Sequence, residues 1–591
     1  MIPKKRYALL TLLSFFFLIP NSHQAKLQKD TTKSKGMLVT LPEQNGLLWE
    51  ITGNGLKKPS YVYGTMHVSS KLAFHLGDSF YYALMRSDMV ALEQNLDTVI
   101  DDWVTERARN GSNKNYNPSI SLNTFDIGRI ERRDINRAIS YDPYVLNGIM
   151  FRRDESAMDF QKETYLDLYI YRLGKKMGKR ITGVEDYMEA NELVKKAQKG
   201  ASEDRKKQKR SDYYKFANFD FNDAYRKGNI KLIDSFERST NGPNFLEYML
   251  FVRNENMVRR MDSIMQLNIS LFAGVGCAHL GAERGVLNLL VKQGYTIRPV
   301  QSMANRLSKI SKKYDDMEYK LNYALEMSPD SSFTCQLPGK WIQSSKGSTF
   351  DIFIYPELVN GYFYTVYKLK TNGTIFGDKP QDVLLRIDSS LYESVPGNII
   401  SQKPINVGGH EGYEVINKTT DGNYQRYYIV ITPLEAYIFK LGGIKDYAIS
   451  KEANKFFKSI SFTQQRQNNF AKFTTQDQML SFNFPAHAAK SKTIVYDSKF
   501  DASFSLFAFD EVTKTTYVAE QIRANVNLDD DTFELKLLLN SYSNTDNFFI
   551  DNYKLSKYKG YDRIDGTMHG TLDRKVETTI ISFNDKIVML S

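Results

Sequence analysis

The feature that most constrains the fold of this chain is a strand followed by Gly-x-x-His, which occurs twice. The first copy is Ser60-Tyr-Val-Tyr-Gly-Thr-Met-His67 and the second is Ser270-Leu-Phe-Ala-Gly-Val-Gly-Cys-Ala-His279. A glycine lets the chain turn tightly after a strand, and the histidine then lies at the C-terminal edge, where α/β proteins place their ligand sites. The two histidines are more than two hundred residues apart, so they share a site only if the fold joins the two strands.

A third copy of the letters, Gly566-Thr-Met-His569, is interpreted as a coincidence. It follows a turn between expected strands, and in the repeat of the C-terminal half it falls opposite residues 418–421, which contain no histidine. Cys277 lies only two residues before His279, a spacing that rarely aligns a nucleophile with its base. The candidate functional residues are therefore His67 and His279.

The composition bounds the architecture and the partners. At 591 residues the chain is too long for a single core, so about two to four domains are expected. An aromatic content of 13% favours β-rich modules. The net charge is +11, but the lysines are scattered and accompany no nucleic-acid-binding motif. We therefore expect no nucleic acid partner.

The N-terminus has the pattern of a secretory signal peptide over residues 1–25. Lys4-Lys-Arg6 is positive, residues 7–20 are apolar but too short to span a bilayer comfortably, and Ala25 is suited to cleavage. The alternative is an uncleaved membrane anchor. A lysine-rich linker follows at residues 26–37. With only two cysteines in the chain there is no disulfide framework, and we expect a periplasmic, secreted or cell-surface protein of bacterial type.

Residues 38–305 have the pattern of an α/β domain with a mainly helical insertion. Strands at residues 47–52 and 61–63 are expected to form a hairpin. The other expected elements are helix 77–87, strand 89–93, a mainly helical segment over 100–265 that includes helix 164–177, helix 283–293 ending at Gly294, and strand 295–299.

Beyond a linker helix at residues 306–329, the pattern becomes β-rich and repeats, with one module at 330–465 and another at 466–591. Matched segments are Glu411-Gly-Tyr-Glu-Val-Ile416 with Lys559-Gly-Tyr-Asp-Arg-Ile564, and Tyr427-Tyr-Ile-Val-Ile431 with Thr578-Thr-Ile-Ile-Ser582. The second module is expected to lack the closing helix and strand of the first, or else the chain is a fragment at its C-terminus. The fold class is thus an α/β (α+β) domain followed by two β-rich α+β modules.

Four further polar residues could serve chemistry. Glu93 and Glu185 each end a strand, and a buried carboxylate is costly unless it is paired or bound to a metal. Simple exposure is the alternative for Glu93. Asp167 lies on an apolar helix, either behind the site or at the surface. Arg253 could hold a carboxylate or a substrate anion, or form a salt bridge on a helix face.

Several segments together make a signature that no single one provides. They are Leu47-Leu-Trp-Glu-Ile51, Tyr63-Gly-Thr-Met-His67, Leu92-Glu93, Leu166-Asp167, Gly178-Lys-Arg-Ile-Thr-Gly-Val-Glu185, Arg253-Asn254, Gly274-Val-Gly-Cys-Ala-His279 and Gly285-Val-Leu-Asn-Leu-Leu-Val-Lys-Gln-Gly-Tyr-Thr-Ile-Arg-Pro-Val300. With these segments the chain resembles the TraB/GumN family, which includes bacterial periplasmic or surface proteins and the animal Tiki proteases. The resemblance spans about residues 40–305 and leaves the β-rich modules outside it.

The resemblance implies an α/β domain of the erythromycin-esterase/ChaN-like type with paired Gly-x-x-His motifs and a glutamate at the active centre. Tiki members are described as peptidases that depend on manganese or cobalt. By position, the metal ligands here would be His67, Glu93 and His279. Cys277 stands where the family usually has a smaller residue, which leaves the histidine itself in place.

Two imidazoles and a carboxylate suit an open site for a divalent metal ion, whether manganese, cobalt or zinc. Such an ion lowers the pKa of bound water and polarises a carbonyl, and Glu185 could act as the general base. The residues expected behind the site or at the substrate are Asp167, Arg253, Gly64 and Gly276.

The sequence therefore predicts an exported metal-dependent hydrolase, first of all a peptidase acting on a peptide or protein, with β-rich modules that could dock a cell-envelope partner. One alternative is a non-enzymatic periplasmic or surface protein that binds a peptide or signal. Another is a metal-free, histidine-dependent hydrolase like the related esterases. The chain has no His-Glu-x-x-His helix, so it is not an ordinary zinc protease.

Overall fold

The computed structural model of the chain describes residues 45–591 with a set of gaps. The gaps are 67–73, 75, 104–123, 126–145, 147–148, 151–163, 208–219, 302–307, 347–349, 371–380, 382–383, 386, 388–394, 433–434, 464–469, 475–480, 486–488, 492–494, 498–499, 511–512, 514, 525–530, 546–547, 571–574 and 584–585. The predicted signal peptide, the linker at 26–37 and His67 lie outside the described residues. Within the described part, no helix has the length and apolar character needed to cross a membrane.

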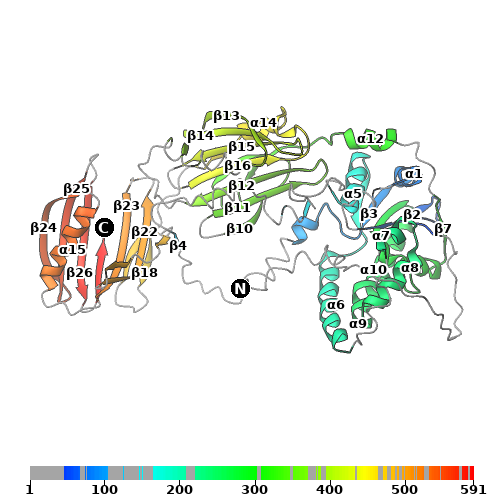
Figure 1. Cartoon of the computed structure of the whole chain (residues 1–591), viewed down its shortest axis with the longest axis horizontal. Helices are drawn as coiled ribbons and strands as arrows, with labels where there is room; N and C mark the ends of the chain where they lie inside the picture. Colours follow the sequence, from blue (N-terminus) through cyan, green and yellow to red (C-terminus); the bar gives the residue numbers. More distant parts are fainter. Residues whose placement is uncertain are drawn as a thin grey trace. The chain divides into compact units, whose positions relative to one another are not determined.

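The described residues form a mixed α/β fold with several sheets (Figure 1). They divide into two compact units. The first unit takes the described residues within 1–115, 147–321 and 358–361. The second takes those within 116–146, 322–357 and 362–591. The division after residue 321 falls inside the predicted linker, where helix α12 (Ser308–Asp316) is present.

One six-stranded sheet organises the first unit, in the order β5-β3-β6-β2-β1-β7. Its strands are β1 (Leu48–Gly53), β2 (Ser60–Thr65), β3 (Met89–Leu92), β5 (Arg180–Gly183), β6 (Leu271–Gly276) and β7 (Tyr295–Pro299). The first four strands in that order run parallel, and β1 is antiparallel to both of its neighbours, so the predicted hairpin is confirmed. Parallel strands are covered on both faces, which is why β2 and β6 are buried along their whole length.

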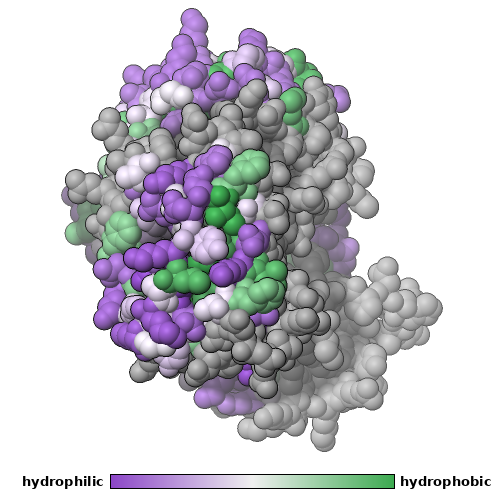
Figure 2. All heavy atoms as spheres, turned by 90° about the vertical axis from the view of Figure 1, so that its left-hand side faces the viewer, coloured by the Kyte–Doolittle hydropathy of each residue, from purple (hydrophilic) through white to green (hydrophobic). Residues whose placement is uncertain are grey.

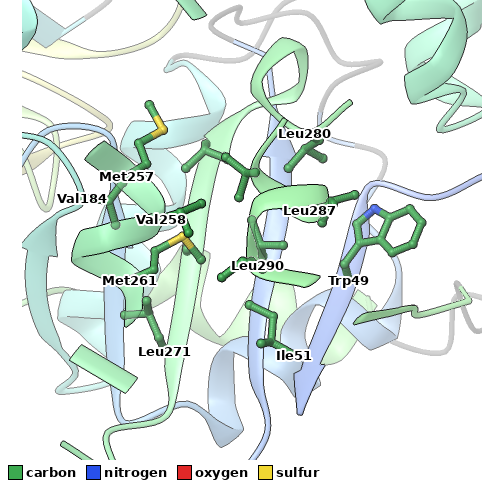
Figure 3. Packing of buried hydrophobic residues seen from close by; sticks show 14 of the residues in the cluster. Trp49, Ile51, Val184, Met257, Val258, Met261, Leu271, Leu280, Leu287 and Leu290 are labelled. Carbon is green, nitrogen blue, oxygen red and sulfur yellow. The ribbon is translucent and has the colours of Figure 1, made fainter. Parts of the chain in front are cut away.

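Besides α12, the described helices of this unit include α1 (Asp78–Arg86), α5 (Leu166–Lys176), α6 (Tyr187–Lys207), α7 (Phe221–Arg226), α8 (Ile230–Thr240), α9 (Pro243–Leu246), the π-helix η3 (Glu247–Phe251), α10 (Val252–Met265), the 3-10 turn η4 (Cys277–His279) and α11 (Val286–Lys292). Met261 of α10 and Leu287 of α11 belong to the same apolar cluster as Trp49 and Ile51 of β1 (Figure 3). Strand β6, which carries the second motif, and helix α10, which carries Arg253, both contribute to this core.

Helix α11 begins later than its sequence pattern predicts. The predicted start at residue 283 is wrong, because the helix begins at Val286 with Gly285 as its N-cap. A Cβ atom at Gly285 would lie 1.5 Å from the carbonyl oxygen of Gly281, so the chain folds back on itself here and only glycine fits. The predicted end at Gln293 is one residue too late, because the helix ends at Lys292 with Gln293 as its C-cap, and Gly294 follows the cap with a φ of 93°.

The second unit contains two large sheets. The seven-stranded sheet has the order β10-β11-β12-β16-β15-β14-β13. Its elements and those beside it are β8 (Ala324–Met327), β9 (Phe333–Leu337), β10 (Ile342–Lys346), β11 (Phe350–Glu357), β12 (Tyr362–Lys370), β13 (Asn398–Val407), β14 (His410–Lys418), β15 (Tyr424–Ile431), β16 (Glu435–Gly442), η5 (Tyr447–Ile449), α14 (Ala453–Lys458) and β17 (Ser461–Phe462). Strands β17, β9 and β8 form a separate three-stranded sheet.

The nine-stranded sheet has the order β24-β25-β26-β27-β23-β22-β20-β4, with β21 paired to β22. The elements of this region are β4 (Thr124–Phe125), β18 (Phe470–Thr474), β19 (Ser481–Pro485), β20 (Ala489–Ser491), β21 (Val495–Asp497), β22 (Phe500–Asp510), β23 (Thr515–Ala524), α15 (Asp531–Thr545), β24 (Phe548–Tyr558), β25 (Tyr561–Gly570), β26 (Lys575–Phe583) and β27 (Lys586–Leu590). Strands β18 and β19 pair with each other. Figure 2 faces the side where Figure 1 places β24 and α15, and apolar side chains there lie among polar ones.

The two large sheets have the same strand order over seven strands. The first runs β10-β11-β12-β16-β15-β14-β13, and the second runs β20-β22-β23-β27-β26-β25-β24. One detail of the sequence match is wrong, because Gly412 lies inside β14 whereas Gly560 lies in the turn before β25 with a φ of 89°. His569 lies on β25 and pairs with Asp551 in the second unit, whereas the six-stranded sheet belongs to the first.

Candidate functional site

The strands that carry the two Gly-x-x-His motifs are parallel neighbours. Thr65 of β2 pairs with Gly276 of β6, so both motifs leave the sheet at the same carboxyl edge. His67 follows Thr65 by two residues and lies outside the described residues. Both motifs therefore begin at the carboxyl edge of the parallel strands, where α/β proteins bind ligands, as the sequence pattern predicts.

The two candidate glutamates leave the sheet at that same edge. Glu93 directly follows β3, and Glu185 lies two residues beyond β5. The ladder continues past the strands, because the backbone N–H of Glu185 donates to the carbonyl oxygen of Glu93 over 3.0 Å. Strand β3 lies between β5 and β6, so Glu93 is placed between Glu185 and the second motif.

Arg253 of α10 joins the two carboxylates. Its Nε and Nη2 donate to the two carboxylate oxygens of Glu185 over 2.8 and 2.6 Å, and Nη2 also donates to Oε2 of Glu93 over 2.8 Å. Burial alone would lower the pKa of Arg253, but the Glu185 and Glu93 carboxylates raise it above its ordinary value. Burial raises the pKa of Glu185, and the guanidinium opposes that shift. Of the alternatives for Arg253, the structure shows the carboxylate clamp.

His279 faces Glu93 from the other side. Its Nε2 lies 3.6 Å from Oε1 of Glu93, and both side chains are largely buried. The same oxygen accepts a hydrogen bond of 2.7 Å from the backbone N–H of Gly276, the first residue of the motif. Glu93 is thus held by a backbone N–H on one oxygen and by Arg253 on the other, with the imidazole beside it. Simple exposure of Glu93 is excluded.

Asn254 is the site residue to which sequence reasoning gave no role. It is 1% exposed, and its Oδ1 lies 2.6 Å from Nδ1 of His279. Its position directly after Arg253 was the only available signal. Arg253 and Asn254 follow the π-helix η3, and such widened turns are frequent at functional sites.

Asp167 and Gly64 support the first motif. Oδ1 of Asp167 accepts a hydrogen bond of 2.8 Å from the hydroxyl of Thr65, and Asp167 is buried, so a surface position is excluded. A Cβ atom at Gly64 would lie 2.7 Å from Cδ1 of Leu280 and 3.2 Å from Cβ of Cys277. The absence of a side chain at Gly64 therefore leaves room for the side chains of Leu280 and Cys277.

Cys277 packs in the interior between the two motifs. It is 4% exposed, and burial raises the pKa of its thiol well above the ordinary value. A nucleophilic cysteine needs the opposite shift. The thiol therefore fills space in this structure.

The described side chains supply some of the ligands that a divalent metal ion needs. Within the described ranges, which leave out His67, no group of three His, Cys, Asp or Glu side chains is close enough to hold a metal. The pair of His279 Nε2 and Glu93 Oε1 is 3.6 Å apart, and two ligands that each lie roughly 2.0–2.2 Å from one ion have a separation of about this size. The second partner of His279, on Nδ1, is the kind that orients metal-binding imidazoles.

Comparisons with known proteins find a family match for the part of the chain that contains this site. Residues 47–299 match the family model described as the TraB/PrgY/gumN family. No curated protein matches the chain. Two similar solved structures are a protein from Bacteroides thetaiotaomicron (12% identity, 44% of this chain and 87% of that chain, TM-score 0.16) and the T6SS immunity protein TplEi from Pseudomonas aeruginosa (10%, 45%, 86% and 0.13). Likenesses with such TM-scores carry no argument about the fold or function of this chain.

Proposed function

Because residues 47–299 belong to the TraB/PrgY/gumN family, we propose that the carboxyl edge of the six-stranded sheet is the active centre of a metal-dependent hydrolase that cleaves peptide bonds. The observation that supports this most is the buried pair of His279 and Glu93, whose facing atoms are 3.6 Å apart. A buried carboxylate beside an imidazole is the arrangement from which enzymes build metal sites or acid–base pairs.

In this proposal His279 and Glu93 hold a manganese, cobalt or zinc ion, and His67 supplies a further ligand. When bound, the ion would lower the pKa of a water molecule and polarise the substrate carbonyl. Oε2 of Glu93 is already fixed by Arg253, so Oε1 would be the oxygen that binds the ion. Thr65 and Asp167, which are hydrogen-bonded to each other, would keep the first motif in place.

Glu185 has two candidate roles, and the contacts favour the second. As a general base it would have to give up a hydrogen bond, because both of its carboxylate oxygens accept from Arg253. As a positioning residue it would orient Arg253, which in turn fixes Glu93. Glu185→Gln is expected to lower the metal affinity if Glu185 positions Arg253, and to lower kcat at unchanged metal affinity if it is the base.

A metal-free hydrolase with His279 as general base is the second candidate. It is favoured by the contact between Nδ1 of His279 and Asn254, because a base oriented by a third group is the common arrangement in such enzymes. Activity that survives complete removal of metal by a chelator would select this candidate.

The C-terminal sheets are proposed to be two copies of one module, and the helical segment before α10 to be an insertion in the α/β domain. The shared strand order of the two sheets supports the first point. We also propose export through residues 1–25, with the modules docking a cell-envelope partner, on the sequence pattern alone.

Cleavage of a fluorogenic peptide library by the purified chain, with manganese, cobalt or zinc added, tests the proposal. Activity is expected in the wild type and its loss in His67→Ala, Glu93→Gln and His279→Ala. His569→Ala is the matched control, because it removes a histidine from the same four letters as the first motif in the other unit. Peptide binding without turnover under every metal would instead support a peptide-binding protein.

A further inference from the structure

Asn254 has both ends of its side-chain amide committed. Nδ2 donates to the backbone oxygen of Arg284 over 2.8 Å, and Oδ1 lies 2.6 Å from Nδ1 of His279. A backbone carbonyl only accepts hydrogen bonds, so the NH₂ end must face Arg284 and the oxygen must face the imidazole. We infer that Asn254 is a positioning residue that holds His279 in the tautomer with its proton on Nδ1.

This tautomer decides what the other ring nitrogen can do. With the proton on Nδ1, the neutral ring presents a lone pair at Nε2, which lies 3.6 Å from Oε1 of Glu93. The opposite tautomer would set the Nδ1 lone pair against the Asn254 oxygen at 2.6 Å, which is repulsive. Asn254 therefore keeps Nε2 ready to bind a cation or accept a proton. The inference deepens the proposed function and rests on it for its catalytic meaning.

The carbonyl that orients Asn254 is itself anchored. The guanidinium of Arg284 donates to Glu247 over 2.6 Å and to Glu255 over 2.7 Å. Glu247 belongs to η3 and Glu255 to α10, so both acids lie on the continuous helical segment that carries Asn254. Partly exposed ion pairs contribute little stability, and here their effect is to fix the Arg284 backbone over the amide.

Arg253 and Asn254 are adjacent on α10 but contact different residues of the site. Arg253 contacts Glu93 and Glu185, whereas its neighbour Asn254 contacts His279. Successive helical residues point about 100° apart, so one turn of α10 reaches both halves of the site. The acid is fixed by a charged guanidinium and the imidazole by a neutral amide.

Nitrogen-15 NMR of the full chain, labelled only at histidine and freed of metal with a chelator, tests the inference. The chain has 7 histidines, and His279→Gln identifies the His279 signals by their loss. The ring nitrogen shifts of the wild type are expected to report a proton on Nδ1. Asn254→Leu, which removes both hydrogen bonds, is expected to give a mixture of tautomers or the opposite one.

Two further variants keep the test decisive. Asn254→Asp preserves size and an acceptor toward Nδ1, so the ring nitrogen shifts of His279 should still report a proton on Nδ1. Asn256→Leu is the matched control, since Asn256 lies on the same helix but bonds to Glu189 at the surface, and it should leave the His279 signals unchanged.

Wild-type ring nitrogen shifts of His279 in folded Asn254→Leu would overturn the inference. If that variant does not fold, ring nitrogen shifts in Asn254→Asp that place the proton on Nε2 alone would overturn it instead. The readout needs neither metal nor substrate. A wild type that cleaves no peptide would therefore contradict the proposed function while the tautomer result still stands or falls by itself.

Discussion

The backbone N–H of Gly276 donates to Oε1 of Glu93 over 2.7 Å, so the second Gly-x-x-His motif binds the acid of the neighbouring strand. This contact depends on register, because β3 and β6 are parallel with Leu92 paired to Gly274. The motif thus contributes its first residue as well as its last to the site. It aims Oε1 at the same region as Nε2 of His279.

Metal content should follow this pair. Glu93→Gln keeps an acceptor for the Gly276 N–H but removes the negative charge, and His279→Ala removes the imidazole, so both variants are expected to lose at least tenfold in affinity for manganese, cobalt or zinc. Elemental analysis after dialysis against each metal measures this, with His569→Ala as the control. Wild-type metal content in both site variants would remove these two residues from the proposed ligand set.

Much of this site could be predicted from the sequence because its residues follow apolar strands. Glu93 directly follows such a strand, Glu185 and His279 come within three residues of one, and parallel strands end at one edge. The pairing of Arg253 with Glu185 across 68 residues could not be predicted, because a helix residue gives no sign of the strand end it will meet. Asn254 was missed for the same reason.

The fold beyond the site shows a similar limit. Strand runs and the β1–β2 hairpin were readable from alternation and turn residues. The start of α11 was not, since it depends on the close approach of Gly285 to Gly281. The match of Gly412 to Gly560 failed because identical letters occupy a strand in one sheet and a turn in the other.

Arg253 should be essential to the stability of the first unit. Arg253→Met leaves Glu93 and Glu185 buried without their counter-charge, and breaking a buried pair in this way costs about 3–5 kcal/mol. Adding Glu185→Gln should recover part of the loss, because one uncompensated charge is then removed. Urea unfolding in a Trp341→Phe background, which leaves Trp49 and Trp103 as reporters of the first unit, measures it. An Arg253→Met variant as stable as its parent would contradict a stabilising role for the contacts of Arg253 with Glu93 and Glu185.

Gly64→Ala should destabilise the contact between the two motifs. The added methyl would lie 2.7 Å from Cδ1 of Leu280 and 3.2 Å from Cβ of Cys277, and such overpacking costs about 1–3 kcal/mol. Gly46→Ala is the matched control in the same unit, because its nearest neighbour would be an ordinary 3.5 Å away. The same unfolding experiment compares the two, and an equal effect of both substitutions would count against tight packing at Gly64.

Glu237 on α8 should make the first unit less stable as the pH rises toward neutrality. Burial raises the pKa of its carboxyl to about 7, with a further contribution from Asp234. One oxygen accepts from Asn241 over 2.9 Å, and the other is buried without a hydrogen-bond partner among the described residues.

The sign of this effect follows from where the proton is lost. The unfolded chain ionises Glu237 near its ordinary pKa of 4.5, while the folded chain keeps the proton until about pH 7. Stability from this group is therefore present below pH 4.5 and is lost progressively up to pH 7. At pH 8, Glu237→Gln should raise the free energy of unfolding by roughly 2–3 kcal/mol, and at pH 4 by much less. Glu203→Gln, at an exposed position on α6, is the control, and an equal gain from Glu237→Gln at both pH values would contradict the buried proton.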